Sequence, residues 1–204
     1  ITLQHIIETI TGQSLRDFAK ENIFDILGMQ YTDYLPTIQQ QDGKWINTVA
    51  CPWMDRIAPT EKQKDGSVLC GQVHDPLARI LNGGISGNAG IFSNANDIGI
   101  LAAALLNGGE YNGHRILSPL GVKTMCTVPR ELTAFGRTPG WDIFSPYASN
   151  KGDLFSPNTF GHTGYTGTSI IIDPDNDTAV ILLVNAVHPE DRHSIVRLRS
   201  LVAN

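Results

Sequence analysis

Residues 160–169 read Phe-Gly-His-Thr-Gly-Tyr-Thr-Gly-Thr-Ser, and this stretch with the residues after it decides the fold of the second half of the chain. The runs 169–172 and 178–185 that follow are rich in apolar and β-branched residues, and Asp-Pro-Asp-Asn-Asp at 173–177 separates them. Such runs are typical of strands, and aspartate, proline and asparagine at this density are typical of a tight turn. The sequence therefore predicts antiparallel strands joined by a hairpin at residues 173–177.

The same stretch is a candidate functional site. Its three glycines lie among hydroxyl-bearing residues at a strand edge, where a missing side chain lets a ligand approach the backbone. His162 and Thr163, beside backbone N–H groups, have the chemistry to bind an anion or a developing oxyanion. The alternative is a glycine-rich strand and turn with an incidental histidine. Because glycine-rich loops are weak signals, the pattern alone leaves both interpretations open.

The beginning of the chain has a helical pattern. Apolar residues recur at helical spacing over residues 3–10, and Gly12 is a natural stop. Residues 14–17, Ser-Leu-Arg-Asp, resemble a capping box that opens a second helix. The residues expected on the inner face of this helix are Leu15, Phe18 and Ile23.

The rest of the chain mixes long loops with helices. Residues 30–92 have many helix breakers and little periodicity, which predicts a long functional or wrapping loop. Ser93 is expected to cap a helix that ends at residues 107–109, Ser118-Pro119 to open a shorter helix, and a last helix to run from about Glu190 to Val202. Helices and loops, then a small antiparallel sheet, then a helix define an α+β protein.

We interpret residues 1–204 as a single incomplete domain. Within it, residues 1–130 form a mainly helical and loop part, and residues 131–204 form the antiparallel strands with the terminal helix. The chain opens on Ile1, and its first helix has no lead-in, which favours a piece of a longer protein.

A second polar stretch lies in the loop region. His74 and Asp75 are adjacent, and a glycine-rich segment follows at residues 83–93. The two side chains would suit an oriented acid–base pair, but neighbouring residues seldom bond side chain to side chain. The favoured interpretation is that Asp75 caps a helix while His74 packs.

Composition excludes several classes of protein. The 15 basic and 20 acidic residues leave a net charge of −5, so nucleic acid is not expected as a partner. The longest apolar run, residues 98–106, is too short for a membrane span. Three cysteines allow at most one internal disulfide, and the spacing of six histidines fits neither HExxH nor a zinc knuckle, so we expect no metal and no cofactor.

Several motifs together resemble the C-terminal part of a serine β-lactamase-related hydrolase, the group of class C β-lactamases, D-alanyl-D-alanine carboxypeptidases and related esterases. Residues 6–15 and 23–29 are similar to the helix pair that follows the family's Tyr-containing motif. Residues 83–93 with Asp97 resemble its glycine-rich turn before a capped helix, and His162-Thr163-Gly164 resembles its Lys/His-Thr-Gly triplet. The resemblance implies the C-terminal portion of the β-lactamase/penicillin-binding-protein-like fold.

The resemblance also implies roles for residues. The backbone N–H of Tyr165 would be one oxyanion-hole donor, Thr163 and Gly164 would contact substrate, and His162 would occupy the position where many relatives have lysine. A histidine is mostly neutral at pH 7, so a substrate carboxylate would be held less strongly by charge. Asn88 stands where a histidine is expected, and we assign it no catalytic role.

The family's nucleophile lies in a Ser-x-x-Lys motif, and this chain contains none. The resemblance therefore implies that the nucleophilic serine, the lysine and the tyrosine are absent from these 204 residues and that the fragment is inactive alone. The expected function of the parent is acyl-enzyme hydrolysis of β-lactam, D-alanyl-peptide or ester substrates. The alternative is a non-catalytic ligand-binding pseudoenzyme of the same fold.

The resemblance carries two further expectations. A hydrolase of peptidoglycan-like or other small-molecule substrates is expected in the periplasm, secreted or in the cell envelope. In this family, strands from both halves of the protein share one sheet, so this chain should expose a strand edge and an apolar helix face. We expect it to self-associate through such surfaces.

Overall fold

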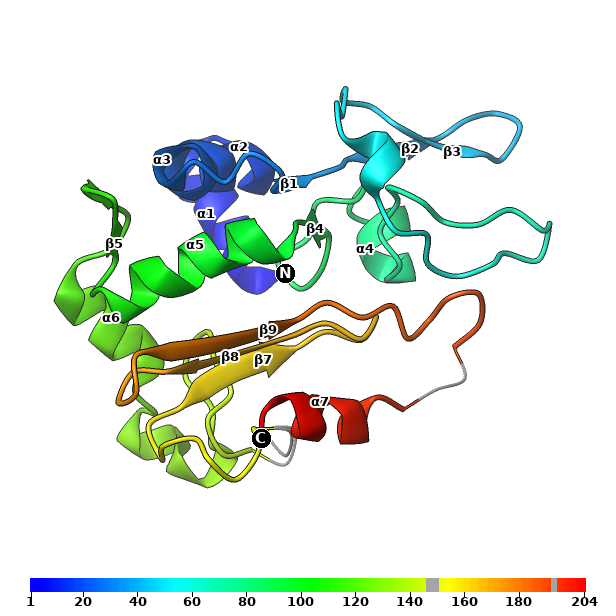
Figure 1. The fold of residues 1–204 in the computed structure, drawn as a ribbon. Coiled ribbons are helices and arrows are strands. Elements are labelled where there is room, and N and C mark those ends of the chain that lie inside the picture. The colour runs from blue at the N-terminus through cyan, green and yellow to red at the C-terminus, as the bar shows by residue number, and fades with distance from the viewer. Residues whose placement is uncertain (146–150, 192–193) are drawn as a thin grey trace. The chain divides into compact units, whose positions relative to one another are not determined.

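The computed structural model describes residues 1–145, 151–191 and 194–204 (Figure 1). These residues form two compact units, one of residues 1–97 with 187–191 and one of residues 98–186 with 192–204. Helices and small antiparallel sheets are present in the chain, as expected for an α+β protein. The interpretation of the chain as a single incomplete domain stays a prediction. So does its division into a helical and loop part, residues 1–130, and a part with strands and a terminal helix, residues 131–204.

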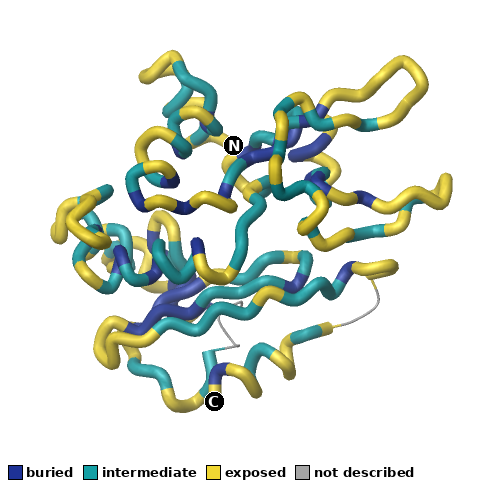
Figure 2. Tube along the Cα trace, turned by 45° about the horizontal axis from the view of Figure 1, so that its top comes forward, coloured by how far each residue is buried: buried dark blue, intermediate teal, exposed yellow. Residues whose placement is uncertain are grey.

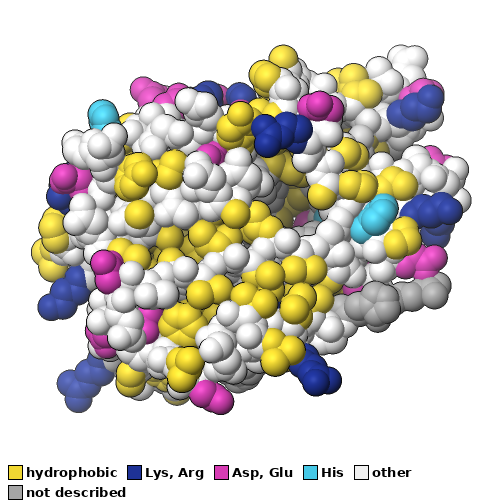
Figure 3. All heavy atoms as spheres, in the orientation of Figure 1, with side chains coloured by type: hydrophobic (Ala, Val, Ile, Leu, Met, Phe, Trp, Pro, Cys, Tyr) yellow, Lys and Arg dark blue, Asp and Glu magenta, His cyan; other side chains and the backbone are white. Residues whose placement is uncertain are grey.

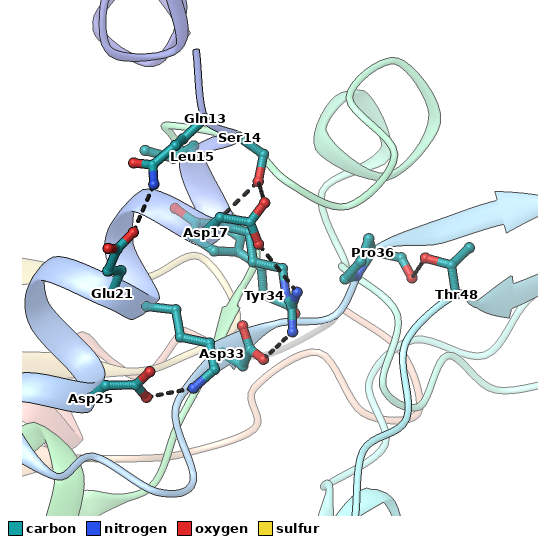
Figure 4. A network of polar contacts seen from close by, with 12 residues as sticks. Gln13, Ser14, Leu15, Asp17, Glu21, Asp25, Asp33, Tyr34, Pro36 and Thr48 are labelled. Carbon is teal, nitrogen blue, oxygen red and sulfur yellow. Dashed lines mark hydrogen bonds and ion pairs between the residues drawn. The ribbon is translucent and has the colours of Figure 1, made fainter. Parts of the chain in front are cut away.

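The first unit begins with the two expected helices. Helix α1 (Thr2–Thr11) ends at Gly12, whose left-handed backbone (φ 69°) suits glycine. Helix α2 (Leu15–Ala19) is capped as predicted, because Ser14 Oγ accepts a hydrogen bond from Asp17 N–H at 3.1 Å. Figure 4 shows this cap in a polar network that also contains the bond from Gln13 to Glu21. Arg16, in the same turn, donates to Asp33 Oδ2 at 2.7 Å and joins the helix to the next segment.

The inner face of the second helix differs from the expectation. A π-helical turn (Lys20–Phe24) separates α2 from α3 (Asp25–Leu27) and inserts one residue into the helical repeat. Ile23 in this turn is only half-buried, and so is Phe18, which precedes the turn. The side chains that are buried on this helical stretch are Leu15, Ala19, Phe24 and Leu27.

Residues 30–92 contain short elements rather than an uninterrupted loop. Strand β1 (Asp33–Tyr34) pairs antiparallel with β4 (Ile91–Phe92), and β2 (Thr37–Gln39) pairs with β3 (Trp45–Asn47). A 3₁₀ turn (Met54–Arg56) and helix α4 (Pro76–Ile80) complete the region. Elements of two to five residues are too short to show a hydrophobic period, which is why the sequence did not predict them.

Helix α5 (Ala95–Leu106) spans the division between the two units. The prediction that Ser93 caps it is wrong: Asn94 Oδ1 accepts from Asp97 N–H at 2.8 Å, whereas Ser93 Oγ contacts Thr32 Oγ1. Both serine and asparagine are good caps, so pattern alone does not choose between neighbours. Asp97 is 1 % exposed and accepts from Tyr31 N–H at 2.7 Å.

After α5, the second unit continues with the hairpin of β5 (Glu110–Tyr111) and β6 (His114–Arg115) and with helix α6 (Pro119–Cys126). Ser118 Oγ caps α6 by accepting from Gly121 N–H at 3.0 Å, as predicted. A 3₁₀ turn (Arg130–Phe135) follows.

The three-stranded antiparallel sheet of the second unit has the order β7 (Phe160–Thr163), β8 (Ser169–Asp173) and β9 (Thr178–Leu182). The predicted hairpin joins β8 to β9, although β9 ends at Leu182 rather than Asn185. Ala102 and Leu105 of α5 form a core with Phe160 and Ile172 of the sheet and with Ile143. Figure 1 shows α5 and α7 (Val196–Val202) on opposite sides of this sheet, and Figure 2 shows buried residues along its strands.

The last helix is shorter than predicted. It begins at Val196 rather than near Glu190, and residues 192–193 of the predicted helix lie outside the described residues. Leu198 and Leu201 of this helix are 40 % and 63 % exposed, so they are not part of the buried core.

Apolar surfaces are exposed in each unit. Helix α1 has no buried residue, and Leu3 and Ile10 are 66 % and 78 % exposed. Among the described strands, β9 pairs with β8 alone, so its other edge carries no strand partner. Figure 3 shows apolar side chains gathered on the surface over α5 and β9. The expected exposed strand edge and apolar helix face are both present.

Candidate active site

The candidate site is the end of β7 and the turn that leads into β8. His162 pairs with Ile170 and Thr163 with Ser169 across the two strands. Gly164 N–H donates to Thr168 O at 2.8 Å and Gly167 N–H donates to Gly164 O at 3.1 Å, which closes the turn. The structure therefore places the whole triplet and Tyr165 on one strand end and its turn.

An added side chain would meet close neighbours at two glycines of this turn. A Cβ atom added to Gly164 would lie 2.3 Å from the Thr168 hydroxyl oxygen. Gly167 has φ +118°, and a Cβ there would lie 2.6 Å from Val184 O. The backbone of the turn is consequently packed closely against its neighbours at these two positions.

His162 is exposed, and its two ring nitrogens have different partners. Nε2 lies 2.8 Å from Arg137 Nη2, and Nδ1 lies 2.9 Å from the backbone oxygen of Thr163. Because a guanidinium only donates and a carbonyl only accepts, Nε2 is the acceptor and Nδ1 carries the proton. These contacts assign the tautomer of the ring that has its hydrogen on Nδ1.

Arg137 brings a fixed positive charge to the triplet, and the sequence analysis did not identify it. It is half-buried, and none of the ion pairs among the described residues includes it. Backbone bridges place it there: Arg137 pairs with Asp142, and Asp142 pairs with Gly161 of β7. No local pattern around Arg137 indicates this contact, because it depends on a neighbouring segment lying along the edge of β7.

The segment beside β7 is held by buried polar groups. Asp142 exchanges backbone hydrogen bonds with Gly161 at 2.9 and 3.0 Å. The Lys151 ammonium donates to the backbone oxygens of Ile143 and Thr159. Burial lowers the pKa of Lys151, and the nearby Asp142 carboxylate opposes that shift. Together these contacts fix the backbone from which Arg137 reaches His162.

Arg199 of α7 is the second residue that sequence reasoning missed. Its Nη2 donates to Gly164 O and to Thr168 O, both at 2.9 Å, on the turn that follows the triplet. Its side chain is partly buried, and burial lowers its pKa. The sequence predicted a helix here but offered no sign of its partner, which lies 35 residues away along the chain.

Thr163 and Gly164 are half-buried, and Tyr165 is 76 % exposed. The structure therefore brings His162, Thr163, Gly164 and Tyr165 together on an accessible strand end with two arginines, Arg137 and Arg199. Their roles in substrate binding and as an oxyanion-hole donor stay predictions.

The second polar stretch is structural where the structure describes it. Asp75 Oδ1 accepts from Ala78 N–H at 2.8 Å and caps α4, as the favoured interpretation expected. His74 Nε2 lies 3.9 Å from Glu61 Oε2, with its side chain 13 % exposed. Asn88 Oδ1 accepts from Ser86 Oγ at 2.6 Å, which is a contact inside the glycine-rich turn.

The cysteines and the metal-ligand residues form no cluster in the described part of the chain. Cys51, Cys70 and Cys126 are free thiols, and burial raises the pKa of Cys126 to about 11. Residues 1–145, 151–191 and 194–204 contain no group of three or more His, Cys, Asp or Glu side chains placed to hold a metal ion. Within the same ranges no helix has the length and apolar character needed to cross a membrane.

A strand ending in His-Thr-Gly, packed on a helical core and followed by a β-hairpin, defines the class of β-lactamase and penicillin-binding-protein-like folds. Two solved structures of this fold each match 98 % of the chain. A family VIII carboxylesterase matches with a TM-score of 0.64 at 18 % identity, over 54 % of its own chain. A β-lactamase from Mycobacterium bovis matches with a TM-score of 0.60 at 19 % identity, over 58 % of its chain.

Sequence comparison gives the family. The family model described as Beta-lactamase matches residues 1–204. A protein of Escherichia coli (strain K12) named "Putative D-alanyl-D-alanine carboxypeptidase" is 36 % identical over 200 residues, which cover 91 % of this chain and 43 % of that protein. The chain belongs to the β-lactamase family, and it spans less than half the length of the curated relatives it matches.

Proposed function

We propose that this chain is the C-terminal part of a serine hydrolase that removes a terminal D-alanine from cell-wall peptides through an acyl-enzyme. The nucleophilic serine, the lysine and the tyrosine of the family lie outside these 204 residues, which contain no Ser-x-x-Lys. The serine attacks the penultimate carbonyl carbon, D-alanine leaves with a proton on its amine, and water then hydrolyses the ester. The chain alone is inactive.

In this proposal the β7 end and its turn form one wall of the active site. Thr163 hydrogen-bonds the substrate, Gly164 lets it approach, and the Tyr165 N–H donates to the oxyanion. Support comes from their position on one accessible strand end and from the relatives' name, D-alanyl-D-alanine carboxypeptidase. A periplasmic or cell-envelope location is part of the same proposal.

The observation that carries the choice of substrate is the contact between Arg137 and His162 at 2.8 Å. His162 by itself would supply no fixed charge, which would favour ester substrates without a carboxylate. Arg137 restores a permanent cation beside it, and a guanidinium matches the two oxygens of a carboxylate. A peptide that ends in a free carboxylate therefore suits this wall better than a neutral ester.

The proposal is tested by labelling with a fluorescent penicillin and a fluorophosphonate probe. The 204-residue chain is compared with an extended protein that includes the upstream family motifs. We expect the penicillin to label the extended protein only. Labelling of the chain alone would show that one of its own serines is the nucleophile, and labelling of neither would favour the ligand-binding pseudoenzyme.

A further inference from the structure

The turn between β7 and β8 is held from inside by a charged side chain that the proposed mechanism has not used. Arg199 Nη2 donates to Gly164 O and Thr168 O at 2.9 Å each, and Gly167 N–H also donates to Gly164 O. On the other side of the turn, Ala186 N–H donates to Thr166 O at 2.7 Å. The carbonyl oxygens of Gly164, Thr166 and Thr168 are thus each held by at least one hydrogen bond.

The first of these carbonyls controls an N–H group. Gly164 C=O and Tyr165 N–H belong to one peptide unit, which is planar and trans, so the two bonds point in opposite directions. Fixing Gly164 O toward Arg199 therefore directs Tyr165 N–H away from Arg199. The orientation of this donor is determined by a residue of α7, not by the turn alone.

The charge of Arg199 adds to this effect. None of the ion pairs among the described residues includes Arg199, so carbonyl oxygens are its recorded partners. Burying a cation without a carboxylate partner costs free energy. A neutral side chain would donate hydrogen bonds to the turn at a lower desolvation cost. A cation at the oxygen end polarises the peptide and strengthens its N–H as a donor to negative charge.

We propose that Arg199 is a positioning residue for acylation: it aims and polarises the Gly164–Tyr165 peptide so that Tyr165 N–H stabilises the oxyanion. This inference rests on the proposed function. It predicts that Arg199 acts on the rate of acylation and not on the affinity for the probe, because the oxyanion forms only in the transition state.

Two measurements test the inference with the variants R199M and R199K, and with R197M, at an exposed arginine of the same helix, as the control. In the 204-residue chain, amide hydrogen exchange of Gly164 and Gly167 should speed up at least about 10-fold in R199M while the β8–β9 amides stay unchanged. In the extended protein, acylation by penicillin should slow roughly 10- to 100-fold with little change in the dissociation constant. R199K should recover part of the rate, and R197M should match the unsubstituted protein.

Unchanged exchange and acylation in R199M would overturn the inference, as would a loss of affinity accompanied by faster exchange throughout the sheet. If the unsubstituted extended protein forms no acyl-enzyme, the proposed function fails and the catalytic part of this inference fails with it. Faster exchange confined to the turn would then show that Arg199 holds the turn for structure only.

Discussion

At the residue scale, two arginines contact the strand end of the candidate site, and we propose a different role for each. Arg137 lies beside the exposed face of His162, and Arg199 lies beneath the backbone of the following turn. Nε2 of His162 is the acceptor in the first contact, because a guanidinium only donates. In the proposed function, Arg137 supplies beside the triplet the positive charge that lysine has in many relatives.

Replacing Arg137 by methionine should weaken recognition of a substrate carboxylate. A hydrogen bond to a charged group is worth about 1.5–3 kcal/mol, so KM for a D-alanyl-D-alanine peptide should rise roughly 10- to 100-fold in the extended protein. Reactivity toward an ester without a carboxylate should stay the same. R130M, at an exposed arginine of the preceding 3₁₀ turn, is the control. Equal losses on both substrates would contradict the role of Arg137.

At the element scale, the β8–β9 hairpin is anchored by one buried carboxylate. Asp173 is 0 % exposed and accepts hydrogen bonds from Ser156 N–H and Oγ, Asp175 N–H and Asn176 Nδ2. Burial alone raises the pKa of Asp173, but these hydrogen bonds outweigh it and hold the pKa well below its usual value. The turn at residues 173–177 was predicted from the sequence, but the hydrogen-bond network that stabilises it was not.

This anchor makes stability depend on pH. Since the pKa of Asp173 is lower in the folded than in the unfolded chain, its contribution is complete above about pH 4 and is lost as the pH falls further. D173N should lower the free energy of unfolding at pH 7 by about 1–3 kcal/mol and flatten the loss below pH 4. Urea unfolding between pH 7 and pH 3 measures both effects.

D177N is the matched control for D173N. Asp177 lies in the same turn, is exposed and has φ 49°, a conformation that asparagine tolerates. The D177N substitution should leave both the free energy of unfolding at pH 7 and its dependence on pH almost unchanged. A similar loss in D177N would assign the effect to the charge of the turn rather than to the buried network.

At the scale of the whole molecule, the chain exposes surfaces that folded proteins usually cover. The outer edge of β9 has no partner among the described strands, and α1 presents an apolar face with Ile10 78 % exposed. Open strand edges and apolar patches favour association with another chain. We propose that the isolated chain self-associates through them.

Sedimentation velocity at micromolar concentration should show oligomers of the isolated chain. I10K introduces a charge on the apolar face of α1 and should shift the distribution toward the monomer. T9K places the same charge at the neighbouring exposed position and serves as the control. A single monomeric species for the unsubstituted chain would contradict the prediction.

Features that depend on neighbouring residues could be predicted from the amino-acid sequence. The helix stop at Gly12, the caps at Ser14, Asp75 and Ser118, and the hairpin at 173–177 all follow from local backbone chemistry and are present in the structure. The resemblance to the family likewise depended on short motifs and on their order along the chain. Even the position of the His-Thr-Gly triplet at a strand end was readable in this way.

The distant groups that contact these motifs became known from the three-dimensional fold. Arg137 is 25 residues from His162, and Arg199 is 35 residues from Gly164. The π-helical turn that moved Phe24 inward is likewise set by packing rather than by spacing. Such contacts form because helices and strands that are distant in the sequence pack against each other. A local sequence pattern predicts the type of each element but not its packing partner.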